Sequence, residues 1–261
     1  MDTGLKDRGI LITGASGGIG QAITRAFAAE GARLALHYHR HRQPVEQLQR
    51  EIQAPSVIVQ ADLRDEHQVQ GMFAEMLRAL SRLDAIVVNA GIWNPHAVPL
   101  HEMTAQQWHE TLEADLTSVF FTCRAFLKHI VEVPRSSASI VLVGSTAALF
   151  GEAEHADYAA AKAGMVYGLT RSLKNEIVRL APGGRVNCVC PGWTDTPRTA
   201  AYTRDPAAVK RATATMALRK IAQSEDVATA IVFLTSEKLS GHISGAILPI
   251  AGGMEGRLLH P

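Results

Sequence analysis

Residues 13–20 of the chain read Thr-Gly-Ala-Ser-Gly-Gly-Ile-Gly, and this glycine-rich stretch decides the fold. An apolar run, Ile10–Ile12, comes directly before it, and an amphipathic segment, Gln21–Glu30, follows. A strand, a glycine-rich turn and a helix in this order are the context that a phosphate-binding fingerprint requires. The N-terminus of a helix carries partial positive charge and free N–H groups, which stabilise a diphosphate. The stretch therefore predicts a turn that holds the pyrophosphate of a dinucleotide.

A second motif, Tyr-Ala-Ala-Ala-Lys at residues 158–162, places a phenol and an ammonium group one helical turn apart on the same face. A free tyrosine has a pKa of about 10, and a nearby cation lowers it toward the range useful for proton transfer. Each motif is weak when taken alone, because such pairs also occur on ordinary surface helices. Together, a dinucleotide cradle and a tuned acid predict the transfer of a hydride and a proton to a carbonyl group.

Short apolar runs alternate with longer amphipathic segments along the chain. The expected strands are Gly9–Thr13, Arg33–His37, Ser56–Gln60, Ala85–Asn89, Ser139–Gly144, Arg185–Val189 and Ala246–Ile250. The expected helices are Gly20–Glu30, Val45–Gln53, Glu66–Ser81, Ala105–Glu132, Asp157–Leu180 and Ser224–Thr235. Such alternation gives a parallel sheet with helices on both faces, joined by right-handed crossovers. We therefore predict an α/β fold with one Rossmann-type doubly wound parallel sheet of about seven strands.

The length of 261 residues suffices for one substantial core, and no linker, repeat or low-complexity tract divides the sequence. We expect a single domain, 1–261, for both dinucleotide binding and catalysis. Residues 191–222 include the one long segment without clear periodicity. In a compact domain such a segment is either a functional flap or disordered, and we expect a substrate flap.

Composition excludes several classes of function. The net charge is +1 and no basic block is present, so we expect no nucleic-acid partner. No stretch approaches the length of a membrane span, and the polar residues Met1–Arg8 do not resemble a secretory signal. The three cysteines, Cys123, Cys188 and Cys190, give no even disulfide framework and are expected to be buried thiols. These features predict a cytoplasmic protein.

Conspicuous residues follow the ends of several predicted strands, where function gathers in an open α/β sheet. They are Asp62, Asn89-Ala90-Gly91, Ser145 and Pro191-Gly192. With the glycine-rich turn, the Tyr158–Lys162 motif and the Pro-Gly-Trp-Thr-Asp-Thr stretch at 191–196, they resemble the short-chain dehydrogenase/reductase family of the compact type. The resemblance covers essentially the whole chain in the order of the family. The overall sequence pattern is similar to that of the 3-oxoacyl-acyl-carrier-protein reductases.

The resemblance implies a role for each motif residue. Tyr158 is the implied general acid in reduction and the base in oxidation, Lys162 lowers its pKa and binds the nicotinamide ribose, and Ser145 stabilises charge on the substrate oxygen. The implied cofactor-binding residues, besides Tyr158 and Lys162, are Gly14, Ser16, Gly18, Ile19 and Gly20 around the pyrophosphate and adenosine ribose, Asp62 and Leu63 at the adenine, Asn89, Ala90 and Gly91 along the adenine and centre, and Pro191, Gly192, Thr194 and Thr196 along the nicotinamide.

The fourth catalytic position of the family departs from the pattern. The family places an asparagine there, in a context that here reads Asp115-Leu116-Thr117-Ser118-Val119-Phe120. In the family this residue helps to hold a water that relays protons to the lysine. An ionised Asp115 accepts hydrogen bonds but cannot donate one, and its charge opposes ionisation of Tyr158. Alternatively, the relay depends mostly on backbone geometry and the aspartate is tolerated.

The choice of cofactor depends on the end of the second strand. NAD-specific relatives place an acid there for the ribose 2′-hydroxyl, whereas this chain has Tyr38. Arg40 and Arg42 are close enough in sequence to meet a 2′-phosphate. Gly17 stands where many NADP-preferring relatives have a basic residue, which argues the other way. We expect NADP(H) to be preferred, with NAD(H) as the alternative.

Three alternating histidines, His37, His39 and His41, lack a nearby carboxylate or thiolate that would complete a metal site, so we predict no metal. Four aromatic residues follow strand ends or lie in the flap and are candidates for the wall of the substrate pocket. These are Trp93, Phe150, Trp193 and Tyr202. Each of them has packing in the flap or at an interface as its alternative role.

The leading hypothesis is an NADP(H)-dependent oxidoreductase for a ketone or secondary alcohol. A 3-oxoacyl thioester is the first substrate to consider, and a small polyol, sugar or steroid-like alcohol the second. A weakly active cofactor-binding sensor is the alternative from another class. The resemblance also implies a homotetramer, because the family commonly pairs the helices matched by Ala105–Glu132 and Asp157–Leu180. The tail Ala251–Leu259 ends in apolar residues that a neighbouring subunit would cover.

Overall fold

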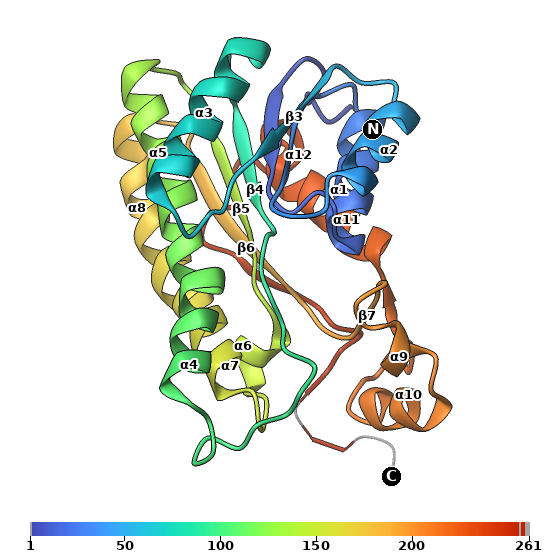
Figure 1. Cartoon of the computed structure of the whole chain (residues 1–261). Helices are drawn as coiled ribbons and strands as arrows, with labels where there is room; N and C mark the ends of the chain where they lie inside the picture. Colours follow the sequence, from blue (N-terminus) through green and yellow to red (C-terminus); the bar gives the residue numbers. More distant parts are fainter. Residues whose placement is uncertain (1, 256, 259–261) are drawn as a thin grey trace.

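The computed structural model describes residues 2–255, 257 and 258 and centres on one parallel sheet (Figure 1). Seven strands lie in the order β3-β2-β1-β4-β5-β6-β9. Their bounds are β1 Gly9–Ile12, β2 Arg33–Tyr38, β3 Ser56–Gln60, β4 Ala85–Val88, β5 Ser139–Val143, β6 Arg185–Pro191 and β9 Ile247–Ile250. All pairings are parallel. The predicted doubly wound Rossmann-type sheet is confirmed, and the order reverses between β1 and β4, where such folds bind their ligands.

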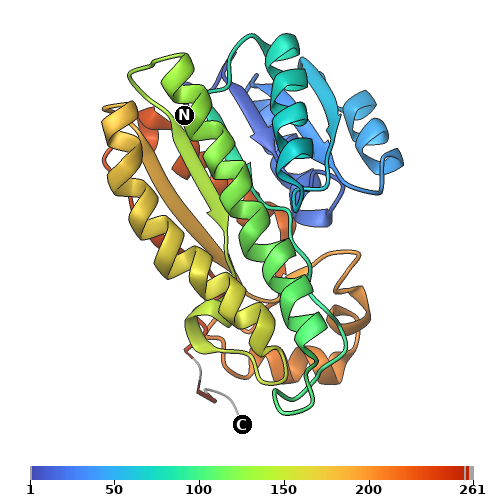
Figure 2. The ribbon, with the colours of Figure 1, turned by 60° about the vertical axis from the view of Figure 1, so that its left-hand side comes forward.

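Helices cover both faces of the sheet. Their bounds are α1 Gly18–Ala29, α2 Gln43–Glu51, α3 Glu66–Leu80, α4 Ala105–Leu112, α5 Ser118–Glu132, α6 Thr146–Phe150, α7 Ala156–Ala163, α8 Thr170–Leu180, α9 Ala200–Thr203, α10 Pro206–Thr213, α11 Ser224–Thr235 and α12 Glu237–Ser240. Helices α3, α5 and α8 lie on one face, while α1 and α11 pack together on the other (Figures 1 and 2). None of these helices combines the length and the apolar character that crossing a bilayer demands.

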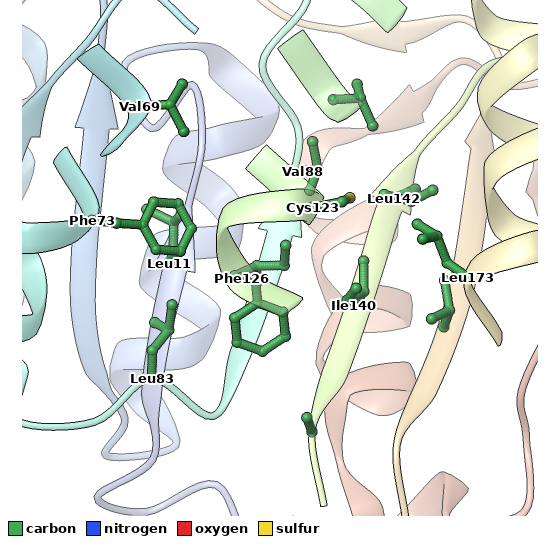
Figure 3. Close-up of a cluster of buried hydrophobic side chains, with 14 of the residues drawn as sticks. Leu11, Val69, Phe73, Leu83, Val88, Cys123, Phe126, Ile140, Leu142 and Leu173 are labelled. Carbon is green, nitrogen blue, oxygen red and sulfur yellow. The ribbon is translucent and has the colours of Figure 1, made fainter. Parts of the chain in front are cut away.

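The core has two layers because every second residue of a strand points to the same face. In β1, Leu11 packs into the cluster under α3, α5 and α8, while Ile10 and Ile12 pack into the cluster under α1 and α11. Figure 3 shows the first layer, in which the Phe126 ring of α5 lies between Leu83 and Ile140. Continuous apolar runs, which predicted these strands, are therefore the consequence of burial on both faces.

Two helices that the sequence predicts as continuous are each interrupted by a π-helical segment. Segment η1, Glu113–Thr117, lies between α4 and α5, and segment η2, Gly164–Leu169, lies between α7 and α8. The segments touch, since a Cβ on Gly164 would lie 3.1 Å from a methyl carbon of Leu116. π-Helical turns widen a helix locally and are frequent at functional sites. Here η1 contains Asp115, and η2 begins shortly after Lys162.

The segment expected to be a flap leaves the sheet after β6 and carries α9 and α10 (Figure 1). A short parallel pair closes its base, formed by β7, Thr194–Asp195, and β8, Ala222–Gln223. Helix α10 begins where Asp205 accepts hydrogen bonds from the amides of residues 207 and 208, and Pro206 occupies the first turn. The Asp-Pro pair is a typical helix start, but the segment lacks long periodicity, so the sequence analysis did not predict this helix.

Candidate active site

The carboxyl ends of the central strands open into a cleft of about 1100 Å³. Eighteen of the twenty residues predicted for catalysis or cofactor binding line it, and Tyr38 and Asp115 do not. The lining residues among them are Gly14, Ser16, Gly18, Ile19, Gly20, Arg40, Asp62, Leu63, Asn89, Ala90, Gly91, Ser145, Tyr158, Lys162, Pro191, Gly192, Thr194 and Thr196. Residues scattered over the sequence thus meet in one cleft because parallel strands place their carboxyl ends on the same edge.

The glycine-rich turn is held in place by the end of β4. The Asn89 side-chain amide donates to the carbonyl oxygens of Thr13 and Gly14 at 3.0 and 3.2 Å, and the Thr13 hydroxyl accepts from the amides of Asn89 and Ala90. Gly14 has φ +66°, and a Cβ there would lie 2.9 Å from the Cα of Ala90. Helix α1 has no acidic residue in its first turn, so its free N–H groups suit a diphosphate. The cradle therefore fits a dinucleotide.

His37 supports the same turn from β2. Its Nδ1 accepts from the Gly14 amide at 3.1 Å, and its Nε2 lies 3.0 Å from the Ala61 carbonyl oxygen, to which it donates. Burial lowers the pKa of His37 to about 4, so the ring is neutral at physiological pH. Both ring nitrogens of His37 are thus engaged by main-chain groups. All three alternating histidines, His37, His39 and His41, line the cleft.

The residues predicted to select the cofactor separate into two groups. Arg40 lines the cleft, whereas the buried Tyr38 points away and donates from its hydroxyl to Oε1 of Gln60 at 3.2 Å. Arg42 is also turned away, since its Nε donates to Oε1 of Glu46 at 2.7 Å. The structure therefore corrects the prediction that Tyr38 contacts the cofactor, and it leaves Arg40 as the arginine placed for a 2′-phosphate.

Asp62 at the end of β3 is engaged by a residue that the sequence reasoning did not single out. Arg64 approaches both carboxylate oxygens of Asp62 at 2.6 to 3.1 Å. This guanidinium lowers the pKa of Asp62 to about 2. Arg64 also lines the cleft, so the end predicted for adenine presents a fixed ion pair.

Lys162 is buried at the catalytic end of the cleft. Its Nζ donates to the carbonyl oxygen of Val143 at 3.3 Å, lies 5.6 Å from the centre of the Tyr158 ring, and forms an ion pair with Oδ2 of Asp115 at 3.5 Å. Burial opposes the positive charge, but attraction to Asp115 and Tyr158 outweighs it and raises the pKa of Lys162. The ammonium group is therefore firmly protonated.

Tyr158 differs from the expectation of a lowered pKa. Burial raises the pKa of the phenol above its ordinary value; Lys162 lowers it, but Asp115 raises it again. A hydrogen bond with Ser145, like the charge of Lys162, lowers the pKa of Tyr158. Ser145 is fixed at the start of α6, where its hydroxyl accepts from the Ala147 amide at 3.1 Å. The predicted effect of Lys162 is present, but burial and the neighbouring carboxylate outweigh it.

Asp115 lies in η1 and its side chain is fully buried. Oδ1 accepts from the Ile92 amide at 2.7 Å, and Oδ2 has no hydrogen bond within the described part of the chain, only the ion pair with Lys162. Burial raises the pKa of Asp115, and Lys162 opposes that rise. Gly91 packs tightly here, because a Cβ would lie 3.1 Å from Nζ of Lys162 and 3.2 Å from Oδ1 of Asp115. The aspartate thus ties the loop after β4 to η1 and to the lysine.

Three of the four aromatic candidates, Trp93, Phe150 and Trp193, line the cleft, and Tyr202 packs against the two tryptophans without lining it. The Trp93 ring lies 6.2 Å from Trp193 and 5.7 Å from Tyr202, edge to face in both cases. The Tyr202 hydroxyl donates to the Pro95 carbonyl oxygen at 3.2 Å, which ties the flap to the loop after β4. Phe150 lines the same cleft. Three segments far apart in sequence, namely the loop after β4, helix α6 and the flap, therefore contribute the aromatic residues of this wall.

Sequence reasoning missed four charged residues of the cleft, namely Arg64, Glu110, Glu152 and Arg198. Glu152 accepts from Nε1 of Trp93 at 3.3 Å, and Arg198 donates from Nη1 to the Gly91 carbonyl oxygen at 3.1 Å. The position of Glu152 between Ser145 and Tyr158 was an available signal, because the segment joining two residues of one site must pass close to it. No sequence signal marks Arg198, because its contact with Gly91 joins residues far apart in the sequence.

The fold and this site define a dinucleotide-dependent oxidoreductase. A family model described as enoyl-(acyl carrier protein) reductase matches residues 14–255. The chain is 37% identical to cis-4-hydroxycyclohexanecarboxylate dehydrogenase of Sinomonas cyclohexanicum, over 97% of this chain and 98% of that protein. It is 31% identical to a 3-oxoacyl-[acyl-carrier-protein] reductase of Synechocystis, over 97% and 98%.

Among solved structures, levodione reductase superposes with a TM-score of 0.86 at 28% identity and covers 95% of this chain and 97% of its own. The chain belongs to the short-chain dehydrogenase/reductase family. It is an NAD(P)-dependent enzyme that acts on alcohol and ketone groups, as its sequence predicted.

We expect Asp115→Asn to shift the pH profile of alcohol oxidation toward lower pH, by less than about one unit. The phenolate form of Tyr158 is the base in oxidation, so the rate rises as pH passes through its pKa. Because Asp115 raises that pKa, a neutral amide lowers it and increases oxidation at neutral pH. The measurement is kcat/KM across pH, together with thermal melting.

Glu113→Gln is the matched control, since it removes an exposed carboxylate from the same π-helical segment. Its profile is expected to coincide with that of the wild type. A lowered melting temperature for Asp115→Asn with an unmoved pH profile would show that Asp115 acts only as a structural tie.

Proposed function

We propose that this enzyme interconverts a ketone and a secondary alcohol on a compact cyclic molecule, with NADP(H) as its cofactor. The observation that carries the proposal is the joining of two walls in one cleft. Ser145, Tyr158 and Lys162 form one wall, and Trp93 and Trp193 belong to the other. A flat, rigid ring packed against aromatic faces would present one of its carbons to the phenol.

The nicotinamide supplies the hydride in reduction and takes it in oxidation. The residues of the chain handle the proton. In reduction, the Tyr158 hydroxyl gives its proton to the carbonyl oxygen, while the Ser145 hydroxyl donates a hydrogen bond to the same oxygen. The phenolate that remains is stabilised by the ammonium of Lys162. In oxidation, the phenolate accepts the alcohol proton and the roles reverse.

The aromatic wall favours a compact ring over a long acyl chain. The hydrogen bond from Tyr202 to Pro95 and the contact of Trp193 with Trp93 join the flap to the loop after β4. The name of the most similar relative reported above denotes a cyclohexane-ring alcohol, whereas another relative is named for a 3-oxoacyl group. The acyl thioester and a sugar or steroid-like alcohol remain the alternatives. A weakly active sensor is disfavoured by the complete Ser145–Tyr158–Lys162 set.

A preference for NADP(H) is supported by the charges around the end of β2. Arg40, His39 and His41 line the cleft there, and no carboxylate stands in the family's NAD position, which Tyr38 occupies. A charge-assisted hydrogen bond from Arg40 to a 2′-phosphate would be worth about 1.5–3 kcal/mol, or one to two powers of ten in affinity. We also retain the prediction of a cytoplasmic location.

We expect Arg40→Ala to weaken NADPH binding by about tenfold to a hundredfold while changing NADH binding by less than about threefold. Arg42→Ala is the matched control, since Arg42 is bound to Glu46 and lies outside the cleft lining. Dissociation constants from cofactor fluorescence provide the measurement. Equal losses for both cofactors, or a wild-type preference for NADH, would refute the proposal.

We expect Tyr158→Phe to remove turnover by at least about a hundredfold and to leave NADPH binding within about threefold, because only the phenol proton is lost. Tyr167→Phe, which removes a hydroxyl from an exposed ring, is expected to be silent. Steady-state rates and cofactor titration test both variants. Retention of most of the wild-type kcat in Tyr158→Phe would assign the acid to another group.

We propose a homotetramer with two-fold symmetry. Exposed apolar side chains lie on α5 and on the run η2–α8, namely Phe120, Val131, Tyr167 and Val178. Helices α5 and α8 lie side by side and present this surface outward (Figure 2). In the tail, Leu258 is exposed, and Leu259 lies outside the described residues. Apolar patches of this kind mark protein interfaces.

Light scattering at micromolar concentration should give the mass of a tetramer. Phe120→Glu should reduce that mass, because burying a carboxylate in an apolar interface is unfavourable. Leu100→Glu is the matched control, as Leu100 is exposed on the loop before α4. A monomeric wild-type protein, or equal effects of both variants, would contradict the proposed interface.

A further inference from the structure

The aromatic wall of the cleft contains one carboxylate among its rings. Glu152 lies in the loop between α6 and α7 and lines the cleft together with Trp93, Phe150 and Trp193. Its side chain retains 29% of its exposure, so the carboxylate is half-buried and still reachable from the cleft. The charge of Glu152 is felt at Tyr158, whose pKa it raises. The carboxylate therefore stands near the reacting end.

The position of this carboxylate is fixed by its neighbours. Oε1 accepts from Nε1 of Trp93 at 3.3 Å and lies 3.6 Å from Nδ1 of His155. The His155 ring stacks on Trp93 with centroids 5.3 Å apart and an interplanar angle of 16°, and its Nε2 lies 2.9 Å from the Asn94 carbonyl oxygen. The two contacts that Glu152 makes, with Trp93 and with His155, both involve Oε1. Within the described ranges no donor bonds Oε2, which leaves that oxygen as a pre-positioned acceptor.

Burial raises the pKa of Glu152 and the neighbouring His155 opposes that rise, whereas Arg198 on the flap bonds a main-chain group instead of this carboxylate. Arg198 on the flap donates to the Gly91 carbonyl oxygen at 3.1 Å, and its charge lowers the pKa of Asp115. Arg198 therefore faces the Lys162 side, where the cofactor residues lie. A ligand group that packs against the aromatic wall therefore lies close to the carboxylate of Glu152.

We infer that Glu152 is a specificity-determining residue that anchors a hydroxyl or ammonium group remote from the reacting carbon and rejects substrates with a carboxylate there. The inference rests on the proposed function and names the substrate class more narrowly. A donor group would bond Oε2 with charge assistance, whereas a second carboxylate in this half-buried wall would be repelled. The chain thereby differs from the relative whose name denotes a hydroxycyclohexanecarboxylate.

The test uses four cyclohexanols that differ only at carbon 4, which carries hydrogen, hydroxyl, ammonium or carboxylate. Values of kcat/KM with NADP⁺ at one pH are compared as ratios, so that any effect of Glu152 on Tyr158 cancels. We expect the wild type to favour the hydroxyl and ammonium compounds over the carboxylate by at least about tenfold. In Glu152→Gln the carboxylate compound should gain about tenfold, the ammonium compound should lose, and the hydroxyl compound should change little because an amide oxygen still accepts.

Glu154→Gln is the matched control, since it removes an exposed carboxylate from the same loop and should leave every ratio unchanged. The binding of the four compounds to the NADPH complex is measured in parallel by tryptophan fluorescence, because Trp93 and Trp193 lie in the cleft. This readout does not require turnover.

The outcomes separate the two proposals. Turnover of these alcohols with ratios that Glu152→Gln does not move would overturn the role of Glu152 and support the proposed reaction. Binding ratios that follow Glu152 without turnover would support the anchor and overturn the proposed reaction for this class. A wild type that prefers the carboxylate, or that neither binds nor oxidises any of the four, would overturn the inference.

Discussion

The catalytic end of the cleft depends on the buried ion pair between Asp115 and Lys162, whose Oδ2 and Nζ atoms lie 3.5 Å apart. Two buried charges of opposite sign tolerate desolvation only together, and removing one partner of such a pair typically costs about 3–5 kcal/mol. Gly91 leaves room for both groups, since a Cβ there would lie 3.1 Å from Nζ of Lys162 and 3.2 Å from Oδ1 of Asp115. The pair also joins η1, which contains Asp115, to α7, which contains Lys162, and Asp115 bonds the loop after β4 through the Ile92 amide. The phenol of Tyr158 thus works in a field set jointly by a cation and an anion, with burial raising its pKa.

The glycine-rich turn at the cofactor end is stabilised by hydrogen bonds between side chains and main-chain groups. The side chains of Thr13, Asn89 and His37 all bond main-chain groups around the glycine-rich turn. A neutral histidine with a pKa of about 4 suits this role, because its charge state does not change under physiological conditions. The turn is therefore preorganised, which reduces the entropy that a dinucleotide would lose on binding.

The substrate end depends on contacts between the flap and the loop after β4. The aromatic contact of Trp93 with Trp193, the hydrogen bond of Tyr202 to Pro95 and that of Arg198 to Gly91 all cross the cleft. Since these contacts are few and partly exposed, they suit a segment that must admit and release ligands. Trp93 and Trp193 of the aromatic wall thus lie on loops, while Ser145 directly precedes α6 and Tyr158 and Lys162 lie on α7.

The sequence by itself determined the seven strands, the sheet class and the glycine-rich turn, because burial on both faces and turn chemistry leave local patterns. The motifs and the family resemblance also predicted the Ser145–Tyr158–Lys162 set, and the structure brings these three residues together in one cleft. The sequence did not determine that Tyr38 and Arg42 turn away from the cleft or that Arg64 engages Asp62. It also missed the π-helical interruptions, the net rise in the pKa of Tyr158, and Glu152 beside Trp93. Each of these depends on which side chain meets which across elements distant in sequence, and on how far water is excluded there. Local propensity contains no information on either, so only the tertiary structure decided them.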